Sequence, residues 1–412
     1  MAVIEFPQLI ARGCGLDVHK DTVVASIKGT GIQEETRTFA TFTKDLEALF
    51  DWLKSVQITH IAMESTGVYW RPVYYVLENG FEIILVNARH IKNVPGHKTD
   101  KKDSEWIAKL LLSGLLRHSF IPEGWVRELR TLLRHRKKLV NERSREKNRL
   151  QNILESDRRA DANIKLGSVV SDVFSKTGQG IIDLLLDGVT DPIVLSNQAK
   201  GSLVNKKQAL QQALYGHFTD RHRFMLKLLT ETMGALDKLI AQLDQQIELC
   251  LTGKQDELAL LQTIPGVSRQ SAIGIVSEIG IDMSQFTSDK HLASWAGVCP
   301  GNNESAGKVR SARTTHGNTY LKTTLIEASW AASHTMNTYL SFKYHKLTQR
   351  RGKKKAAMAI AHHILTASYH ILRDKLPYKE PAMRAEILIE RRKAEIQRLE
   401  NRVRKLKILA SQ

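Results

Sequence analysis

Cysteine is scarce in this sequence: 412 residues contain only Cys14, Cys250 and Cys299, which stand far apart. No two of them form a C-x-x-C pair, so a disulfide framework and a zinc knuckle built on paired cysteines are both excluded. Sparse, unpaired cysteines are typical of proteins in a reducing compartment. We therefore expect a cytoplasmic protein without structural disulfides.

Long apolar runs are also missing. A helix needs about 18 consecutive apolar residues to span a membrane, and no such run occurs. The N-terminal stretch MAVIEFPQLIARGCG lacks the basic start and the long apolar centre of a secretory signal. We expect neither export nor a membrane partner.

Acidic residues are outnumbered, with 43 Asp and Glu against 61 Lys and Arg, which gives a net charge of +18. Such an excess favours a polyanionic partner, and nucleic acid is the first candidate. A basic coat on an ordinary surface remains the alternative. The chain is longer than the chains that usually fold around a single hydrophobic core, so two or three domains are expected.

Residues 1–122 have the pattern of an α/β domain. The expected strands are CGLDVHK, TVVASIKG, ETRTFATF, HIAMES and FEIILVN, and the expected helices lie near residues 44–55, 68–78 and 100–116. The first three strands follow one another closely, as in an antiparallel meander, whereas helices separate the later ones, as in parallel crossovers. This order predicts an RNase-H-like sheet.

The rest of the chain is predicted to be helical. Residues 123–252 include a heptad seam, which predicts a coiled-coil region or helix bundle and offers a surface on which two protomers can pair. Its members are Leu226, Leu229, Met233, Leu236, Ile240, Leu243 and Ile247. An earlier basic helix has a weaker seam, interrupted by Arg136, Arg143 and Lys147. Residues 253–376 predict a mainly α domain, and residues 377–412 a basic helical tail.

Four carboxylates stand at the ends of expected elements. Strand alternation places Asp17 and His19 on one face, and Glu64 ends another strand. Asp100 and Asp103 lie three apart where a helix begins, although the helix dipole alone can explain acids there. Oxygen ligands of this kind suit Mg²⁺ or Mn²⁺, and two such ions about 4 Å apart can stabilise the attacking and leaving oxygens of phosphoryl transfer.

A Pro-Gly turn, Pro265-Gly266, joins two apolar helical segments near the start of the C-terminal block. This pattern predicts a helix-hairpin-helix, whose backbone N–H groups can hold a phosphate without reading bases. An ordinary turn between two helices is the alternative.

Ser305 stands further on, in a polar loop rich in Gly, Asn and Ser. Three cations that follow it, Lys308, Arg310 and Arg313, can orient a phosphodiester. Lys353, Lys354 and Lys355 begin an apolar helix, where a bound phosphate would offset the unfavourable interaction of cations with the helix dipole.

The segments GLDVHKDTVVASI, AMESTGVYWRPVYYVLE and LVNARHIKNVPGHKTDKKDSEWIAKLL resemble the N-terminal RuvC-like domain of the DEDD transposases of the insertion-sequence 110 family. The resemblance implies that Asp17, Glu64, Asp100 and Asp103 form a metal-binding quartet. Lys98 and Lys101 fall within the matching stretches and are candidates for phosphate contacts.

The segment HLASWAGVCPGNNESAGKVRSARTTHGNTYLKTTLIEASW resembles the C-terminal transposase domain of the same family. In that domain a serine before a Gly-Lys step is the nucleophile, and Ser305 is the residue that matches. Glu304 and Ala306 depart from the usual neighbours of this serine, so Ser311 remains an alternative.

The resemblance implies an enzyme that cleaves and rejoins DNA, in which Ser305 attacks a phosphodiester and the carboxylate-bound ions neutralise developing charge. It also implies a structured non-coding guide RNA and a homo-oligomer, a dimer or tetramer with sites composed between subunits, which would work at the nucleoid. Two alternatives remain: a RuvC-like junction nuclease, in which water attacks, and a non-enzymatic architectural nucleic-acid-binding protein.

Overall fold

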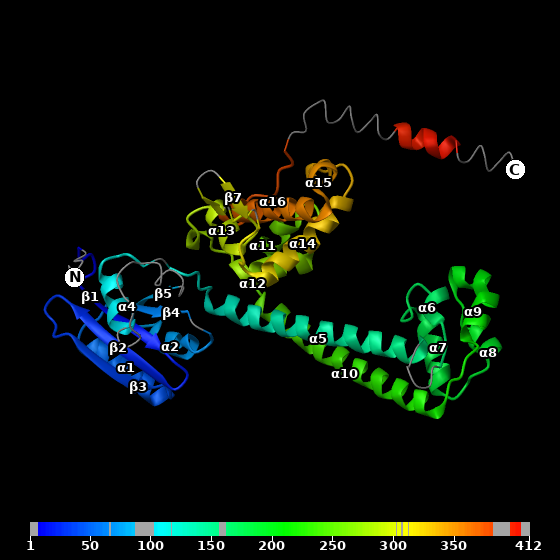
Figure 1. Cartoon of the computed structure of the whole chain (residues 1–412), viewed down its shortest axis with the longest axis horizontal. Coiled ribbons are helices and arrows are strands. Elements are labelled where there is room, and N and C mark those ends of the chain that lie inside the picture. The colour runs from blue at the N-terminus through cyan, green and yellow to red at the C-terminus, as the bar shows by residue number, and fades with distance from the viewer. Residues whose placement is uncertain are drawn as a thin grey trace. The chain divides into compact units, whose positions relative to one another are not determined.

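The computed structural model describes residues 7–65, 67–86, 103–116, 118–155, 162–301, 303–305, 308–311, 313–381 and 396–404. The chain divides into two compact units, Met1–Ile121 and Pro122–Gln412, which are taken separately below (Figure 1). Among the described residues, no helix combines the length and the apolar character that crossing a membrane requires.

The first unit contains a five-stranded mixed sheet with the order β3-β2-β1-β4-β5. The strands are β1 (Arg12–Val18), β2 (Thr22–Gly29), β3 (Glu35–Ala40), β4 (His60–Glu64) and β5 (Glu82–Val86). The β1/β2 and β2/β3 pairs are antiparallel, whereas β1/β4 and β4/β5 are parallel. The predicted sheet, a meander followed by crossovers, is therefore confirmed.

Helices cover both faces of this sheet (Figure 1). On one face, Leu16 and Met63 pack with buried residues of α1 (Thr43–Ser55) and α2 (Trp70–Leu77). On the other face, Ala62 packs with residues of α4 (Asp103–Leu112). Because side chains alternate along a strand, Asp17 and Glu64 belong to the α4 face.

Two glycines let α4 lie directly on β1. A Cβ atom on Gly15 would lie 2.1 Å from the backbone oxygen of Ser104, and one on Gly13 would lie 2.8 Å from Leu111. The Ser104 hydroxyl hydrogen-bonds the Ser26 hydroxyl of β2 over 2.8 Å. The N-terminal end of α4 therefore lies over the C-terminal part of β1. Asp103, the first residue of α4, is thus at the same end of the strand as Asp17.

Replacing Gly15 by alanine tests this close packing. We expect Gly15→Ala to lower the free energy of unfolding of the first unit by about 1–3 kcal/mol, because the new methyl group must displace helix backbone. Hydrogen exchange of peptides from residues 12–29, read by mass spectrometry, should speed up. Gly234→Ala is the control, since nothing lies within 4 Å of a Cβ there in α10 (Asp220–Cys250). Unchanged exchange in Gly15→Ala would contradict the packing argument.

Two long helices, α5 (Gly124–Glu155) and α10, pack along each other in the second unit. The heptad residues of α10 are buried or half-buried in this contact. Arg143 pairs with Asp237 of α10 over 2.7 Å, and Arg136 pairs with Asp244. Two of the three basic interruptions in α5 are thus partners of acids on α10, whereas the Lys147 ammonium lies 4.6 Å from the centre of the Phe174 ring. The seam is occupied within the chain, which corrects the expectation that it pairs two protomers.

A small helical cluster connects the far ends of α5 and α10. It contains α6 (Leu166–Val169), α7 (Lys176–Leu186), α8 (Pro192–Ser196), η2 (Gly201–Lys206) and α9 (Lys207–Leu214). Its core, which includes Ile181 and Leu210, continues onto Leu154 of α5 and Leu226 of α10. This packing fixes the cluster on the helix pair.

The remaining helices form one bundle that includes α16 (Lys353–Asp374), whose apolar face is buried. They are α11 (Gln255–Gln262), α12 (Arg269–Ile279), η3 (Met283–Gln285), α13 (Asp289–Ala296), α14 (Thr319–His334) and α15 (Tyr339–Arg351). Further along, residues 396–404 are also helical. The mainly α character predicted for residues 253–376 is confirmed.

The prediction of a loop around Ser305 is wrong in one respect. Two short strands, β6 (Asn303–Ser305) and β7 (Lys308–Ser311), form an antiparallel pair there. Val309 is the one apolar residue in these two strands, so the apolar alternation that reveals a strand in sequence is weak.

Candidate functional site

Three of the four predicted carboxylates belong to neighbouring elements of the first unit. Leu16 pairs with Met63 in the parallel β1/β4 register, so Asp17 and Glu64 follow at the carboxyl ends of adjacent strands. Both belong to the α4 face, and Asp103 stands at the start of the described part of α4. The carboxyl ends of parallel strands are where α/β sheets place their ligands.

Asp17 has a histidine partner. Its Oδ2 atom lies 3.0 Å from Nε2 of His19, and the Asp17 side chain is 24% exposed. The contact orients the carboxylate while leaving part of it open to solvent. The sequence placed these two residues on one face, which agrees with the observed pair.

The predicted quartet is not complete in the described residues. Asp100, Lys98 and Lys101 lie outside them. Within the residues that the structure does describe, no three His, Cys, Asp or Glu side chains are grouped to hold one metal ion. The chemistry of the described donors still suits a hard cation, because Asp17 and Glu64 are carboxylates at the ends of adjacent strands and Asp103 is a carboxylate at the start of α4.

Ser305 is the last residue of β6 and pairs with Lys308, the first residue of β7. Ser311 stands at the other end of the hairpin, across from Asn303. The Ser311 hydroxyl accepts a hydrogen bond from the backbone N–H of Arg313 over 3.2 Å. That bond gives Ser311 a role in the local turn.

Two glycines hold the ends of this hairpin segment together. Gly297 and Gly317 have φ values of +72° and +50°, and a Cβ atom on Gly317 would lie 2.4 Å from the Gly297 nitrogen. Closer to the strands, the Gly301 N–H donates to the Arg313 carbonyl over 2.8 Å. The hairpin is therefore tied to the helical core at its base.

The segment after the hairpin is fixed by α14. The Lys322 ammonium donates to the carbonyls of Thr315 and His316 over 3.0 and 3.1 Å, and partial burial lowers the pKa of Lys322. Asn318 caps α14 by accepting from two backbone N–H groups through its side-chain oxygen. These contacts set the direction in which the chain leaves the hairpin.

A buried carboxylate, Glu278 of α12, joins three helices. Its side chain is 3% exposed and lies 2.8 Å from Arg134 and 3.2 Å from Arg130 of α5. The side-chain amide of Asn318 donates to the same carboxylate over 2.6 Å. The sequence analysis missed this network, because its members are widely separated in the chain and no local pattern marks them.

The predicted helix-hairpin-helix corresponds to α11, the Pro265-Gly266 turn and α12. Gly266 has a φ of +86°, and a Cβ atom there would lie 2.3 Å from the Ala332 nitrogen of α14. Close packing on α14 therefore explains the glycine, as in an ordinary turn between helices. A phosphate contact at this turn stays a prediction.

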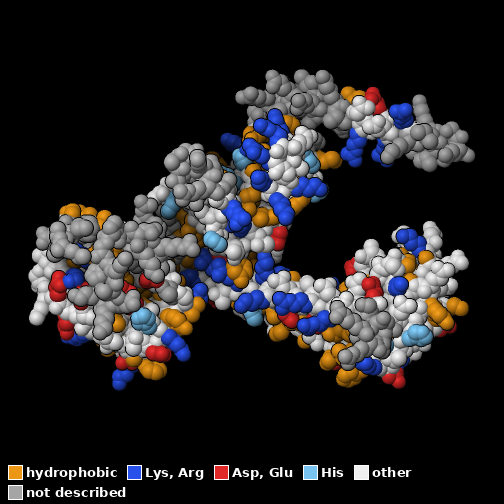
Figure 2. Space-filling model, in the orientation of Figure 1, with side chains coloured by type: hydrophobic (Ala, Val, Ile, Leu, Met, Phe, Trp, Pro, Cys, Tyr) orange, Lys and Arg blue, Asp and Glu red, His pale blue; other side chains and the backbone are white. Residues whose placement is uncertain are grey.

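Cations gather where α15 meets α16. Lys353, Lys354 and Lys355 are exposed at the start of α16, and the N-cap residue of this helix is Gly352, which has no side chain to cap it. Arg350 and Arg351 precede them at the end of α15. Figure 2 shows Lys and Arg side chains over this region and along α5. Arg313 is exposed as well. For Lys308 and Arg310 the structure describes the backbone, which belongs to β7.

Comparison with known proteins gives two family matches. Residues 14–156 match a family model described as a transposase of the DEDD type, and residues 258–346 match one described as "Transposase IS116/IS110/IS902 family". Together the matches span more than half of the chain. The first implies an RNase-H-like fold, which agrees with the mixed sheet of the first unit.

Curated relatives include the "Pilin gene-inverting protein" of Moraxella bovis and that of Moraxella lacunata. Each is 33% identical to this chain over 147 residues, which is 34% of this chain and 45% of the relative. The match thus spans a little under half of their length. The two family matches, which follow each other along the chain without overlapping, show that this chain belongs to the transposases of the IS110 family.

Proposed function

We propose that this chain is a DNA transposase or recombinase that cleaves DNA strands and rejoins them. The observation that carries the proposal is the placement of Asp17 and Glu64 at adjacent strand ends on the α4 face, with Asp103 at the start of α4. The name of the Moraxella relatives supports the reaction class, because inverting a gene requires strands to be cut and joined again.

We place the metal site at Asp17, Glu64, Asp100 and Asp103, with Mg²⁺ or Mn²⁺ as the ion. A divalent ion bound there would supply positive charge against the phosphate oxygens of a reacting strand. His19 acts as a positioning residue, because its contact with Asp17 fixes one carboxylate. Lys98 and Lys101 are proposed phosphate contacts beside the site.

Ser305 is the proposed nucleophile. Its hydroxyl oxygen attacks phosphorus and loses its proton, while the bond from phosphorus to the leaving strand oxygen breaks and that oxygen gains a proton. The resulting serine–DNA ester conserves the phosphodiester energy, so the reverse attack by a strand hydroxyl joins DNA without an external energy source. Lys308, Arg310 and Arg313 would orient the phosphate.

The proposed partners are DNA, a structured non-coding guide RNA and further copies of the same chain, as a dimer or tetramer. The support for nucleic acid is the net charge of +18 together with the exposed cations at Lys353, Lys354 and Lys355. The Pro265-Gly266 turn is a further candidate phosphate contact. Guide pairing would supply the sequence choice that phosphate contacts alone do not give.

Sequencing of co-purified nucleic acid tests the proposal. Protein isolated gently at low salt should retain a defined RNA, and DNA segments that pair with it should be cleaved and rejoined when added back. Cleavage without rejoining would favour the junction-nuclease alternative. Binding without any strand cleavage in the presence of Mg²⁺ would favour the architectural alternative.

Salt dependence gives a separate prediction. Each phosphate neutralised on duplex DNA contributes about 0.9 to the slope of log affinity against log salt concentration. We therefore expect affinity for duplex DNA to fall steeply between dilute and physiological buffer, and the triple variant Lys353→Gln, Lys354→Gln, Lys355→Gln to have a shallower slope. Fluorescence anisotropy measures both. A flat slope in the unmodified protein would mean that the basic excess only coats the surface.

A further inference from the structure

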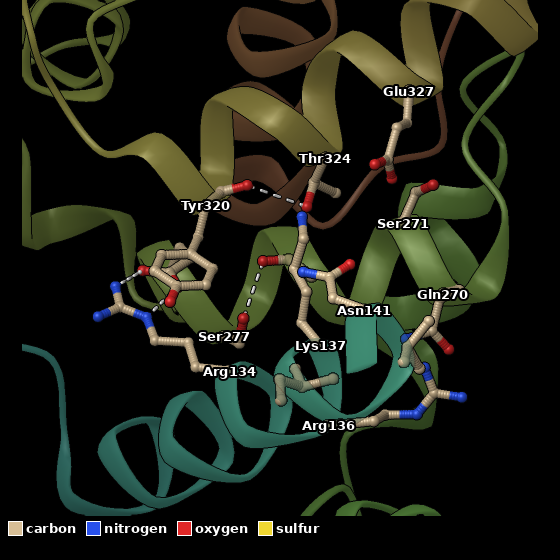
Figure 3. A pocket seen from close by; sticks show the side chains of 14 residues that line it. Arg134, Arg136, Lys137, Asn141, Gln270, Ser271, Ser277, Tyr320, Thr324 and Glu327 are labelled. Carbon is tan, nitrogen blue, oxygen red and sulfur yellow. Dashed lines mark hydrogen bonds and ion pairs between the residues drawn. The ribbon is translucent and has the colours of Figure 1, made fainter. Parts of the chain in front are cut away.

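A groove lies between α5, α12 and α14 in the second unit, with a volume of about 270 Å³ (Figure 3). The helices α12 and α14 pack closely against each other at this groove. A Cβ atom on Gly274 of α12 would lie 2.9 Å from the methyl carbon of Thr324 on α14. The buried Glu278 network ties α5 to α12 at one end of the groove. The groove is therefore formed by packed helices and not by loops.

The rim of the groove carries polar side chains of mixed type. Asn141 comes from α5, Gln270 from α12 and Glu327 from α14, and all three line the groove (Figure 3). Within the described part of the chain, none of these three side chains forms a hydrogen bond or ion pair with another residue. Each amide offers both donors and an acceptor, whereas the carboxylate only accepts.

This mixture fits the edge of a nucleobase better than a phosphate. A base edge presents donors and acceptors together, and Asn and Gln side chains pair with it through two hydrogen bonds. A phosphate only accepts hydrogen bonds, and Glu327 would repel it. The acidic group therefore argues against a simple anion site, even though Lys137 stands nearby on the same wall.

An aromatic ring stands at one end of the groove. The Arg134 guanidinium lies 4.3 Å from the centre of the Tyr320 ring, and the Lys137 ammonium lies 6.0 Å from it. Rings and guanidinium planes of this kind are the surfaces on which unpaired bases stack. The ion pair with Glu278 fixes Arg134, so this surface is already ordered.

We propose that the groove binds one unpaired nucleobase of a nucleic-acid strand. The inference rests on the proposed function, since it takes nucleic acid as the partner, and it adds a place where a base is held outside a duplex. The volume lies just below the range of about 300–1,000 Å³ typical of ligand pockets, which suits a single base and not a paired segment.

The test compares oligonucleotides with and without bases. Full-length protein is titrated with short single strands of mixed sequence, as DNA and as RNA, and with the corresponding abasic DNA strand, using fluorescence anisotropy. Asn141→Ala and Gln270→Ala should each weaken binding of strands that carry bases by about 5–150-fold, the equivalent of one bidentate base contact. Binding of the abasic strand should not change. The DNA and RNA arms identify which strand supplies the base.

Two matched controls separate a base contact from a general effect. Gln246→Ala removes an exposed amide from α10 outside the groove and should leave affinity unchanged. Lys138→Gln removes an exposed cation next in sequence to Lys137. It should weaken the binding of strands with bases and of the abasic strand to the same extent. The inference is overturned if Asn141→Ala and Gln270→Ala bind like the unmodified protein, or if they lose equal affinity for the abasic strand. Failure of the unmodified protein to bind any strand would overturn the proposed function as well.

Discussion

Asp103→Ala should reduce DNA strand cleavage by about a thousandfold or more while the chain stays folded. The carboxylate is proposed to hold a metal ion, and ions at such sites contribute several kcal/mol of transition-state stabilisation. The substitution costs the fold little, because an acid in the first turn of a helix contributes only about 0.3–1 kcal/mol through the helix dipole. Cleavage by the unmodified protein should likewise stop when a chelator removes divalent ions.

Asp51→Ala serves as the control for this prediction. Asp51 is an exposed acid of α1, on the opposite side of the sheet from α4, so its removal should leave cleavage unchanged. Hydrogen exchange of the first unit should be the same in both variants. Full cleavage by Asp103→Ala, or full cleavage in the chelator, would show that Asp103 holds no essential metal ion.

Ser305→Ala should abolish strand joining and leave nucleic-acid affinity unchanged. Alanine removes the hydroxyl oxygen that is proposed to form the protein–DNA ester, and without that ester the phosphodiester energy is not conserved. Ser311→Ala should keep most of the activity, because that hydroxyl accepts the Arg313 N–H in a local turn. Quantifying joined and cleaved strands on denaturing gels separates these results. Cleavage at the unmodified rate by Ser305→Ala would point to water as the nucleophile.

The local patterns of this sequence predict local structure well. The β-rich runs between residues 12 and 86 and the turns and helical segments between them were enough to predict each strand of the first sheet and its direction. A single acid in a strand is common, so Asp17 and Glu64 were predicted as site residues from the order and spacing of the four acids and from the resemblance to the insertion-sequence 110 family. Periodicity also predicted the long helices α5 and α10.

Long-range contacts were not predictable in the same way. The seam of α10 has the same period whether it meets another protomer or α5 of its own chain, so its partner could not be inferred from spacing. The Glu278 network joins residues of α5, α12 and the start of α14, and each of them looks like an ordinary surface residue in sequence. The groove beside it follows from that helix packing and carries no sequence motif.

Mapping a covalent protein–DNA adduct tests the central claim most directly. Reaction mixtures containing Mg²⁺ and cleavable DNA are denatured, digested with protease and nuclease, and examined by mass spectrometry. We expect a peptide carrying a nucleotide on Ser305, present with the unmodified chain and absent with Ser305→Ala. A nucleotide on Ser311 would move the nucleophile to that residue. Cleaved DNA without any adduct would contradict the serine mechanism.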